Sequence, residues 1–372
     1  MERRNNFDAL RLLAAVTVIF SHSFLIAQGV EQGDPLNIIT GNQCMIGLAA
    51  VFVFFAVSGF LITQSYEQTR SPLRYLVKRA LRIFPALIVV LLLTAFVLGP
   101  VVTSLPLHEY LHRPEPYRYV LHNAIFNVDM HTLPGVVFVD NAIGLEVSGA
   151  LWTLGPEFQM YLMVMVLGVF RLLRLPVCLA LLALGMACIH FDELDALGSW
   201  GWLLGFFAMG MTLYKLRGTR IFDGRIALLA VVGLIASVPL RQFILLFPLF
   251  GCYLALYLAL HPRLPIIPAA RYGDLSYGIY IYGWPAEQLS IWLMRGHAQW
   301  WQVFLLATLI AGTLAFLSWH LIEKRALAFK PGAPKPGAGA WQGWRDGIWR
   351  KAWPRKSPTV AISPSNTASR NG

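Results

Sequence analysis

Arg11 and His22 lie in one hydrophobic stretch, and their types and spacing could do chemistry. They are 11 residues apart. Because an α-helix completes close to a whole number of turns over that interval, both side chains share one face. The separation of roughly 16 Å along the axis, at about 1.5 Å per residue, puts Arg11 near one membrane surface and His22 well inside the bilayer. Ionisable side chains inside a membrane usually line a cavity or a pathway, so the pair predicts a functional site. A packed histidine bonded to a neighbouring helix is the alternative.

Basic residues at the start of the third hydrophobic stretch form a second candidate site. Lys78 and Arg82 are four residues apart and Arg79 and Arg82 are three apart, so one helical turn presents them as a cluster. Such a cluster could bind phosphates through charge-assisted hydrogen bonds. Ordinary anchoring of the span by cytoplasmic basic residues is the alternative.

A carboxylate lies where the long loop of residues 104–151 returns to a hydrophobic stretch. Glu157 and Tyr161 are one helical turn apart and can face one cavity, and Trp152 precedes them as an interface anchor. Glu157 could orient an imidazole or bind a sugar hydroxyl. An acid at a helix start, stabilised by the helix dipole, is the alternative.

A polar stripe opens the ninth hydrophobic stretch. Ser276, Tyr280 and Glu287 recur at intervals of four and seven, on one side of the predicted helix. Polar side chains along a helix in lipid either line a site or bond neighbouring helices, and both interpretations stay open for this stripe.

Composition decides the class of fold. Apolar residues make up 57% of the 372-residue chain and charged residues 13%, and the mean hydropathy is +0.58. These values are typical of a polytopic membrane protein, so we expect an all-α bundle of about ten transmembrane helices. The ten predicted spans are 8–28, 46–66, 82–103, 152–170, 175–190, 197–214, 226–240, 242–261, 275–294 and 302–322.

Basic residues in alternate loops set the topology. The positive-inside rule predicts that these loops and both termini are cytoplasmic. The same loops account for the net charge of +11, because their basic residues are spread along the chain and do not form one patch with aromatic residues. No nucleic-acid partner is therefore expected.

The last segment differs in composition from the rest. From Lys330 it is basic, polar and rich in Pro, Gly and Ser. We therefore expect a membrane-embedded domain at 1–328 and a largely disordered cytoplasmic tail at 329–372. A short interfacial helix on anionic lipid is predicted near 340–353, and a tail that is disordered throughout is the alternative. The four cysteines lie far apart, and no metal site is expected.

Six segments follow one another in a recognisable order from residue 7 to about 325. They are Phe7–Arg11 with His22, Phe55–Ile62, Arg79–Arg82 with Ile83 and Pro85, Leu151–Glu157, Leu275–Tyr282, and Glu323–Arg325. Together they resemble the acyltransferase-3 family of bacterial membrane proteins, which modify extracytoplasmic or envelope carbohydrates. Two positions depart from the family pattern: Phe158, where many members carry a second Glu, and Trp284, where many carry a His.

The resemblance implies an activity and its partners. We expect an enzyme of the bacterial inner membrane that transfers an acyl group, usually acetyl, from cytoplasmic acyl-CoA to a sugar hydroxyl. The acceptor would be a surface polysaccharide, an O-antigen or a lipid-linked sugar. Acyl-CoA, the carbohydrate acceptor and membrane lipids are the expected partners, and a homodimer is left open.

The resemblance and the helix geometry together assign roles to residues. Donor phosphates are expected at Arg11, Lys78, Arg79 and Arg82, and the thioester then lies beside His22, the general base. Glu157 is expected to orient His22 or stabilise it when protonated, or to bind the acceptor instead. The residues expected to contact the acceptor are Trp152, Tyr161, Tyr280 and Glu287. The expected supporting residues are Asp8, which positions Arg11, Ser58, which with Gly59 permits close helix packing, and Ser276.

Other interpretations stay open. A proton-coupled transporter or flippase of a lipid-linked sugar would also use about ten helices with an intramembrane histidine and carboxylates. A lipid-regulated structural subunit is a third interpretation, against which the polar residues of spans one, four and nine argue. Within the transferase interpretation, direct transfer is preferred to an acyl-histidine intermediate because it needs no second site.

Overall fold

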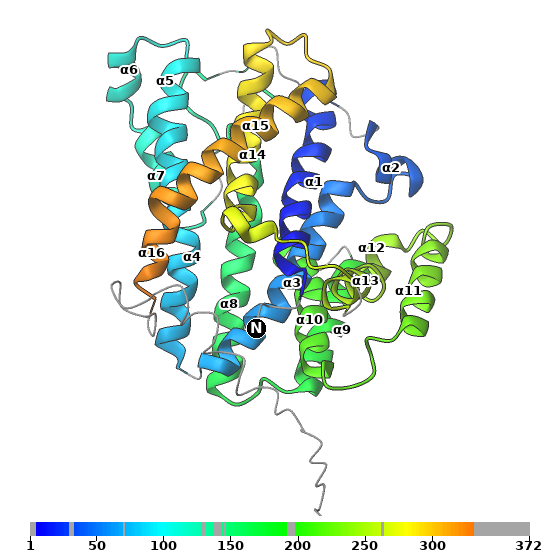
Figure 1. Cartoon of the computed structure of the whole chain (residues 1–372). Helices are drawn as coiled ribbons and strands as arrows, with labels where there is room; N and C mark the ends of the chain where they lie inside the picture. Colours follow the sequence, from blue (N-terminus) through cyan, green and yellow to red (C-terminus); the bar gives the residue numbers. More distant parts are fainter. Residues whose placement is uncertain are drawn as a thin grey trace, which may run out of the picture. The chain divides into compact units, whose positions relative to one another are not determined.

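The computed structural model describes residues 5–29, 33–69, 71–127, 131–136, 138, 143–144, 146–191, 198–261 and 264–330. Within these residues all regular structure is helical, which confirms the all-α prediction (Figure 1). The interfacial helix predicted near 340–353 lies outside the described residues.

A helix occupies each of the ten predicted spans, but only six of the described helical segments are long and apolar enough to cross a membrane. The count of about ten spans is therefore not confirmed. Two of the six segments are single helices, α1 (Phe7–Gln28) and α3 (Ile46–Thr69). Two are pairs of elements, η3 (Gly149–Thr153) with α8 (Leu154–Val169), and α12 (Phe243–Leu246) with α13 (Gly251–Leu260). The last two are continuous runs of three elements: α4 (Pro72–Leu93), η2 (Thr94–Leu98) and α5 (Gly99–Val102) form one, and α15 (Trp300–Ser318), η6 (Trp319–Glu323) and α16 (Lys324–Ala328) form the other. The other elements are α2 (Pro35–Ile39), α6 (Leu107–His112), α7 (Glu115–Ala124), α9 (Leu175–His190), α10 (Gly198–Leu216), α11 (Gly224–Ser237), η5 (Ala269–Tyr272) and α14 (Ser276–Leu293).

Helix α14 is long but is not among the six apolar segments. Of its 18 residues 15 are buried, including Tyr280, Glu287 and Gln288. A helix covered by protein need not present an apolar surface to lipid, because its polar side chains meet other side chains. The polar stripe of α14 therefore fits a position inside the bundle.

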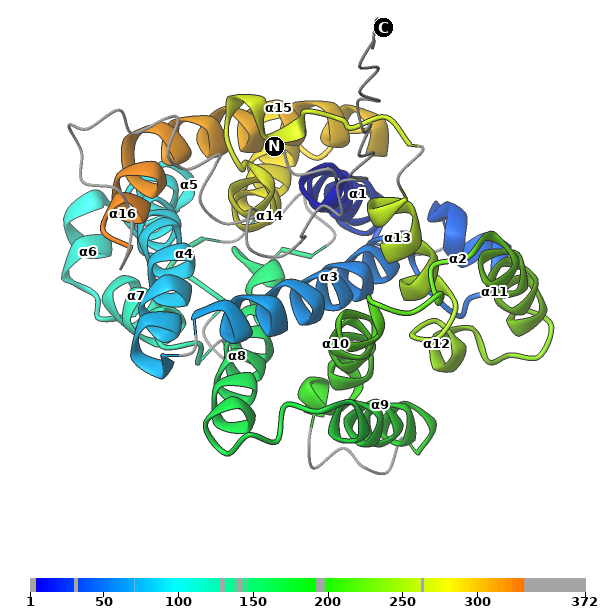
Figure 2. The same cartoon turned by 60° about the horizontal axis from the view of Figure 1, so that its bottom comes forward.

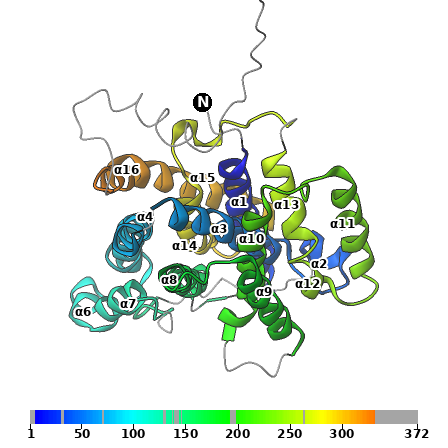
Figure 3. The same cartoon turned by 90° about the horizontal axis from the view of Figure 1, so that it is seen from below.

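Five helices form a closed ring in the order α1, α3, α8, α4 and α14, in which each helix contacts the next and α14 contacts α1 (Figure 2). Helix α15 crosses α14 and α1 obliquely, and its continuation α16 lies beside α4 (Figure 1). Helices α10 and α13 pack against α3, and α9 and α11 lie beyond them (Figure 3). The five helices enclose the interior of the ring, where a site could lie.

Glycines bring α3 and α10 into backbone contact. A Cβ atom on Gly59 would lie 2.0 Å from the carbonyl oxygen of Phe207, and one on Gly210 would lie 1.9 Å from that of Ala56. Small residues of this kind allow helices in a membrane to approach closely. The predicted packing role is thus confirmed for Gly59, whereas the Ser58 hydroxyl bonds a side chain of α8.

The junction between α1, α2 and α3 depends on Asp34, which is almost fully buried. Its carboxylate caps α2 by accepting the backbone N–H groups of Leu36 and Asn37, and it accepts the N–H of Ile46 at the start of α3 at 3.0 Å. The Ser21 hydroxyl of α1 donates to the same carboxylate at 2.5 Å. Helix N-termini stabilise a negative charge, so one buried acid connects three helices.

Replacing Asp34 should destabilise the protein more than the loss of one helix cap. Asp34→Ala removes bonds to three helices, so we expect a cost above the ~1 kcal/mol typical of a single cap and a lower Tm in detergent. Asp223→Ala is the matched control, because the exposed Asp223 side chain caps only α11 through the N–H of Arg225. Equal decreases in Tm for the two variants would contradict this account.

Candidate active site

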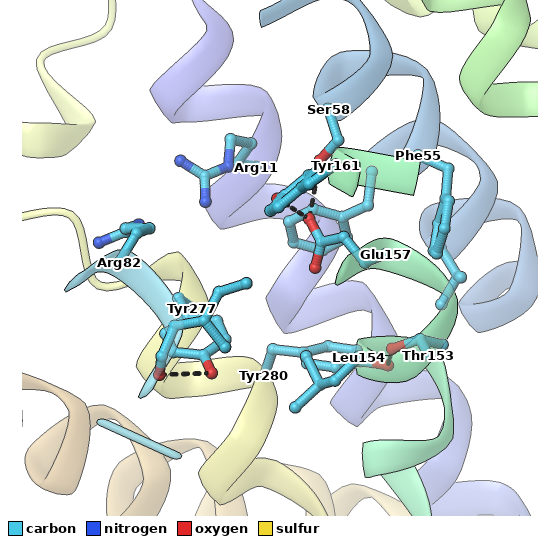
Figure 4. A pocket seen from close by; sticks show the side chains of 13 residues that line it. Arg11, Phe55, Ser58, Arg82, Thr153, Leu154, Glu157, Tyr161, Tyr277 and Tyr280 are labelled. Atoms are coloured by element: carbon cyan, nitrogen blue, oxygen red, sulfur yellow. Dashed lines mark hydrogen bonds between the residues drawn. The ribbon is translucent and has the colours of Figure 1, made fainter. Parts of the chain in front are cut away.

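One cavity lies inside the ring, and a second adjoins it, lined by residues of α1, α2, α3 and the segment between α2 and α3. The first, the arginine cavity, has a free volume of about 50 Å³ and is lined by Arg11, Arg82, Ser58, Glu157 and Tyr161 among others (Figure 4). The second, the histidine cavity, has about 240 Å³ and is lined by residues that include His22, Asn37, Asn42 and Trp152. The 11-residue spacing is thus realised as predicted, with Arg11 and His22 both facing the interior but in neighbouring cavities.

His22 lies against a fully buried carboxylate of α14. The imidazole Nδ1 is 3.5 Å from Oε2 of Glu287, which has no hydrogen-bond partner among the described residues. The other carboxylate oxygen accepts the Ser23 hydroxyl at 3.4 Å. The Trp284 ring meets the imidazole edge-on at 4.9 Å between centroids. The imidazole is therefore held by α14, and its contact with Glu287 can shorten when His22 takes up a proton.

The expected pairing of Glu157 with His22 is not found. Within the described residues no hydrogen bond or ion pair joins them. Glu157 instead accepts the Ser58 hydroxyl at 3.0 Å and the Tyr161 hydroxyl, all in the arginine cavity (Figure 4). Glu287, which was expected to contact the acceptor, lines neither cavity and lies behind the imidazole. Glu287 and not Glu157 therefore lies beside His22, because α14 packs extensively along α1.

Arg11 and Arg82 share one carboxylate at the start of α14. Asp274 accepts Arg11 Nη1 at 3.0 Å, Arg82 Nη2 at 2.6 Å and the Ser276 hydroxyl at 2.8 Å. Burial alone would raise the Asp274 pKa, but the two guanidinium groups outweigh burial and lower it, so Asp274 is ionised. Asp8, which was expected to position Arg11, lies within electrostatic range of it, and the direct ion pair of Arg11 is with Asp274.

The other two predicted cations do not line the arginine cavity. Lys78 donates to the Thr69 hydroxyl at 3.0 Å. Arg79 lies within electrostatic range of Arg11 and Arg82, and it donates to the Ser65 hydroxyl at 3.4 Å. Its Nε atom is buried and has no partner among the described residues. A buried guanidinium N–H group without a partner is costly, which makes Arg79 a candidate to bind an anion.

The predicted acceptor residues are divided between the cavities. Trp152 lines the histidine cavity, Tyr161 the arginine cavity, and Tyr280 lines both. The Tyr280 hydroxyl bonds the Thr153 hydroxyl at 2.6 Å and donates to the carbonyl of Ala150 at 2.9 Å. Ser276 supports Asp274, as described above.

Several residues of the site had not been predicted. Asp274 lies two residues before Ser276, the first residue of the polar stripe, and this position was the signal that could have identified it as a site residue. Thr153, Asn37 and Asn42 come from turns and short helices, where no periodicity marks a side chain as inward-facing. Asp34 likewise belongs to a loop.

The sequence contains one pattern that the metal prediction overlooked. Residues 108–112 read His-Glu-Tyr-Leu-His, the spacing of a zinc-binding HExxH helix. In the structure Glu109 pairs with Arg113 at 2.7 Å, and the His112 ring contacts the backbone carbonyl of His108. In the part of the chain that the structure describes, no group of three His, Cys, Asp or Glu side chains could hold a metal ion.

Cys44 lines the histidine cavity as a buried free thiol. Burial and the neighbouring Asp34 carboxylate raise the pKa of Cys44 to about 12. The thiol is therefore protonated at neutral pH, and since the thiolate is the reactive form, Cys44 is a poor nucleophile.

Comparisons with known proteins identify the family of the chain. A family model described as an acyltransferase domain matches residues 4–323. An O-acetyl transferase of Shigella phage Sf6 is 27% identical over 342 residues, which cover 88% of this chain and 97% of that protein. Nodulation protein 10 of Rhizobium leguminosarum bv. viciae is 32% identical over 367 residues, which cover 88% of this chain and 94% of that protein. No solved structure matches the chain significantly. The chain, with its several apolar helices, belongs to the acyltransferase-3 family of membrane proteins.

Proposed function

We propose that this protein transfers an acyl group, normally acetyl, from acyl-CoA to a hydroxyl group of a carbohydrate, with His22 as the general base. The observation that carries the proposal is that His22, backed by the buried Glu287, faces a cavity adjoining one lined by arginines. A phosphate-bearing donor and a neutral acceptor would each have a cavity of suitable chemistry. The similarity to an O-acetyl transferase supports acetyl as the acyl group.

The donor binds on the arginine side in this proposal. Arg11 and Arg82 pair with Asp274, and Arg82 also pairs with Glu323 at 3.5 Å, whereas Arg79 has no carboxylate partner among the described residues. The positive charge of Arg79 suits the phosphates of CoA. The concentration of basic residues at the start of α4 supports a cytoplasmic location for this end.

The acceptor binds in the histidine cavity. Asn37, Asn42 and Gln43 bring amide groups to its wall, and Trp152 adds an aromatic ring. Apart from His22, the described lining residues include no Asp, Glu, Lys or Arg. Amides and an aromatic ring suit the hydroxyl groups and apolar faces of a neutral sugar.

The reaction needs one proton transfer in each direction. The acceptor hydroxyl attacks the thioester carbonyl, and His22 removes the hydroxyl proton as the new C–O bond forms. The C–S bond then breaks, and the CoA thiolate takes up the proton from His22 as it leaves. The products are the sugar ester and CoA with a free thiol. Glu287 holds the imidazole in place and stabilises its protonated form, as a third group does in other nucleophile–base systems.

Removing the general base should abolish the reaction and leave the donor site intact. General bases typically contribute 10²–10⁴-fold, so His22→Ala should lower kcat by about that factor. Transfer of radiolabelled acetyl from acetyl-CoA to cell-envelope polysaccharide measures kcat, and calorimetry measures the Kd of CoA. An unchanged Tm and Kd would show that the fold and the donor site survive. Retained transfer by His22→Ala would remove the assignment.

Glu287 and Glu157 should give different kinetic effects. Because Glu287 contacts His22, Glu287→Gln should lower kcat with little change in the KM for acetyl-CoA. Glu157→Gln is the comparison: it removes a negative charge from the cavity proposed for the donor phosphates, so it should lower that KM and leave kcat nearly unchanged. The split between kcat and KM separates these roles from a general loss of stability. A lower kcat for Glu157→Gln together with an unchanged kcat for Glu287→Gln would instead support the pairing of Glu157 with His22 that was expected from the sequence.

The unpaired guanidinium of Arg79 should contribute to donor affinity. Arg79→Ala should weaken acetyl-CoA binding on the order of tenfold, as expected for the loss of a hydrogen bond to a charged group. Arg225→Ala, on the exposed start of α11, is the matched control and should leave the Kd unchanged. If the Kd is the same for wild type and Arg79→Ala, Arg79 does not bind the donor.

A further inference from the structure

Val51 of α3 and Tyr280 of α14 are the two residues that line both cavities among those described. They therefore stand where the arginine cavity meets the histidine cavity. The neighbouring residues of α3 follow the same path: Leu48 lines the histidine cavity, while Phe54 and Phe55, one turn beyond Val51, line the arginine cavity. A molecule reaching from one cavity to the other would pass between Val51 and Tyr280.

The Tyr280 side of this passage is fixed. Two hydrogen bonds hold the Tyr280 hydroxyl against Thr153 and Ala150, and its ring packs edge-on against Phe54 at 6.0 Å between centroids. A change in the position of the ring would leave buried hydrogen-bonding groups without partners. The width of the passage therefore depends on the opposite side chain, Val51, for which no such bond exists.

We propose that Val51, facing the fixed ring of Tyr280, limits the length of the acyl group that this protein transfers. This inference rests on the proposed function. If the donor phosphates lie on the arginine side and His22 acts from the other, the thioester carbonyl lies at the junction of the cavities. The carbon chain beyond the carbonyl must then fit against Val51 and Tyr280.

The two substrates leave little other space for a long acyl chain. In the proposed function the donor occupies the arginine cavity. The acceptor sugar must lie in the histidine cavity for its hydroxyl to reach His22. A short acyl group such as acetyl satisfies both conditions, and each added methylene would have to displace the Val51 side chain or the acceptor.

The test compares acetyl-CoA with butyryl-CoA in wild type and two Val51 variants. Val51→Ala removes two methyl groups from the passage, so the ratio of kcat/KM for butyryl to acetyl transfer should rise about tenfold or more, which is the low end of discrimination by a hydrophobic pocket. Val51→Ile adds one methylene and should lower that ratio and slow acetyl transfer. Val57→Ala is the matched control, because Val57 is buried on the same helix but lines neither cavity. Its ratio should equal that of wild type.

The outcomes separate this inference from the proposed function. Acetyl transfer by wild type together with an unchanged butyryl preference in both Val51 variants would overturn the role of Val51 and leave the proposed function standing. Absence of acetyl transfer by wild type from acetyl-CoA would overturn the proposed function itself. Should Val51→Ala fail to fold, a butyryl to acetyl ratio for Val51→Ile equal to that of wild type would still overturn the inference.

Discussion

The arrangement of the bundle depends on one partly buried carboxylate that two arginines share. Charges inside a membrane protein are costly unless they are paired, and Asp274 satisfies Arg11 of α1 and Arg82 of α4 from the start of α14. Arg82 extends the network to Glu323 at 3.5 Å, which brings in η6. At the other end of α1, Asp34 binds Ser21 and the start of α3. With α1 fixed at both ends, Arg11 and His22 keep their orientation and the two cavities stay adjoined.

In the account we propose, this constraint places the binding of the donor phosphates and the acyl transfer at His22 in different cavities. Arg11 and Arg82 line the arginine cavity, while His22, which meets the Glu287 carboxylate, lines the histidine cavity. The two departures from the family pattern fit the division. Phe158 packs against Phe84 and Phe126, where a second acid would have no partner, and Trp284 packs against the imidazole while its Nε1 donates to the carbonyl of Glu146. Glu287 is then the carboxylate that supports the base.

Helical periodicity predicted the parts of the site that lie on one helix. The shared face of Arg11 and His22 and the inward stripe of Ser276, Tyr280 and Glu287 follow from spacing alone, and the order of six short segments was enough to indicate the family. Partners on different helices were not predictable in this way. Glu157 was paired with His22 because both are polar residues of membrane spans, but which acid reaches the imidazole depends on which helices pack together. Asp274 and Asp34 were missed for a related reason, since residues in loops and at helix starts have no period that marks the side facing inward.

The central claim is that a donor bound in the arginine cavity presents its thioester to His22 at the junction of the cavities. The most direct measurement is a structure of the protein with a non-hydrolysable thioether analogue of acetyl-CoA. We predict phosphate groups beside Arg79 and Arg82 and the thioether sulfur between Val51 and Tyr280, with the acyl carbonyl turned toward His22. Phosphate groups bound in the histidine cavity, or an acyl carbonyl remote from His22, would contradict the account.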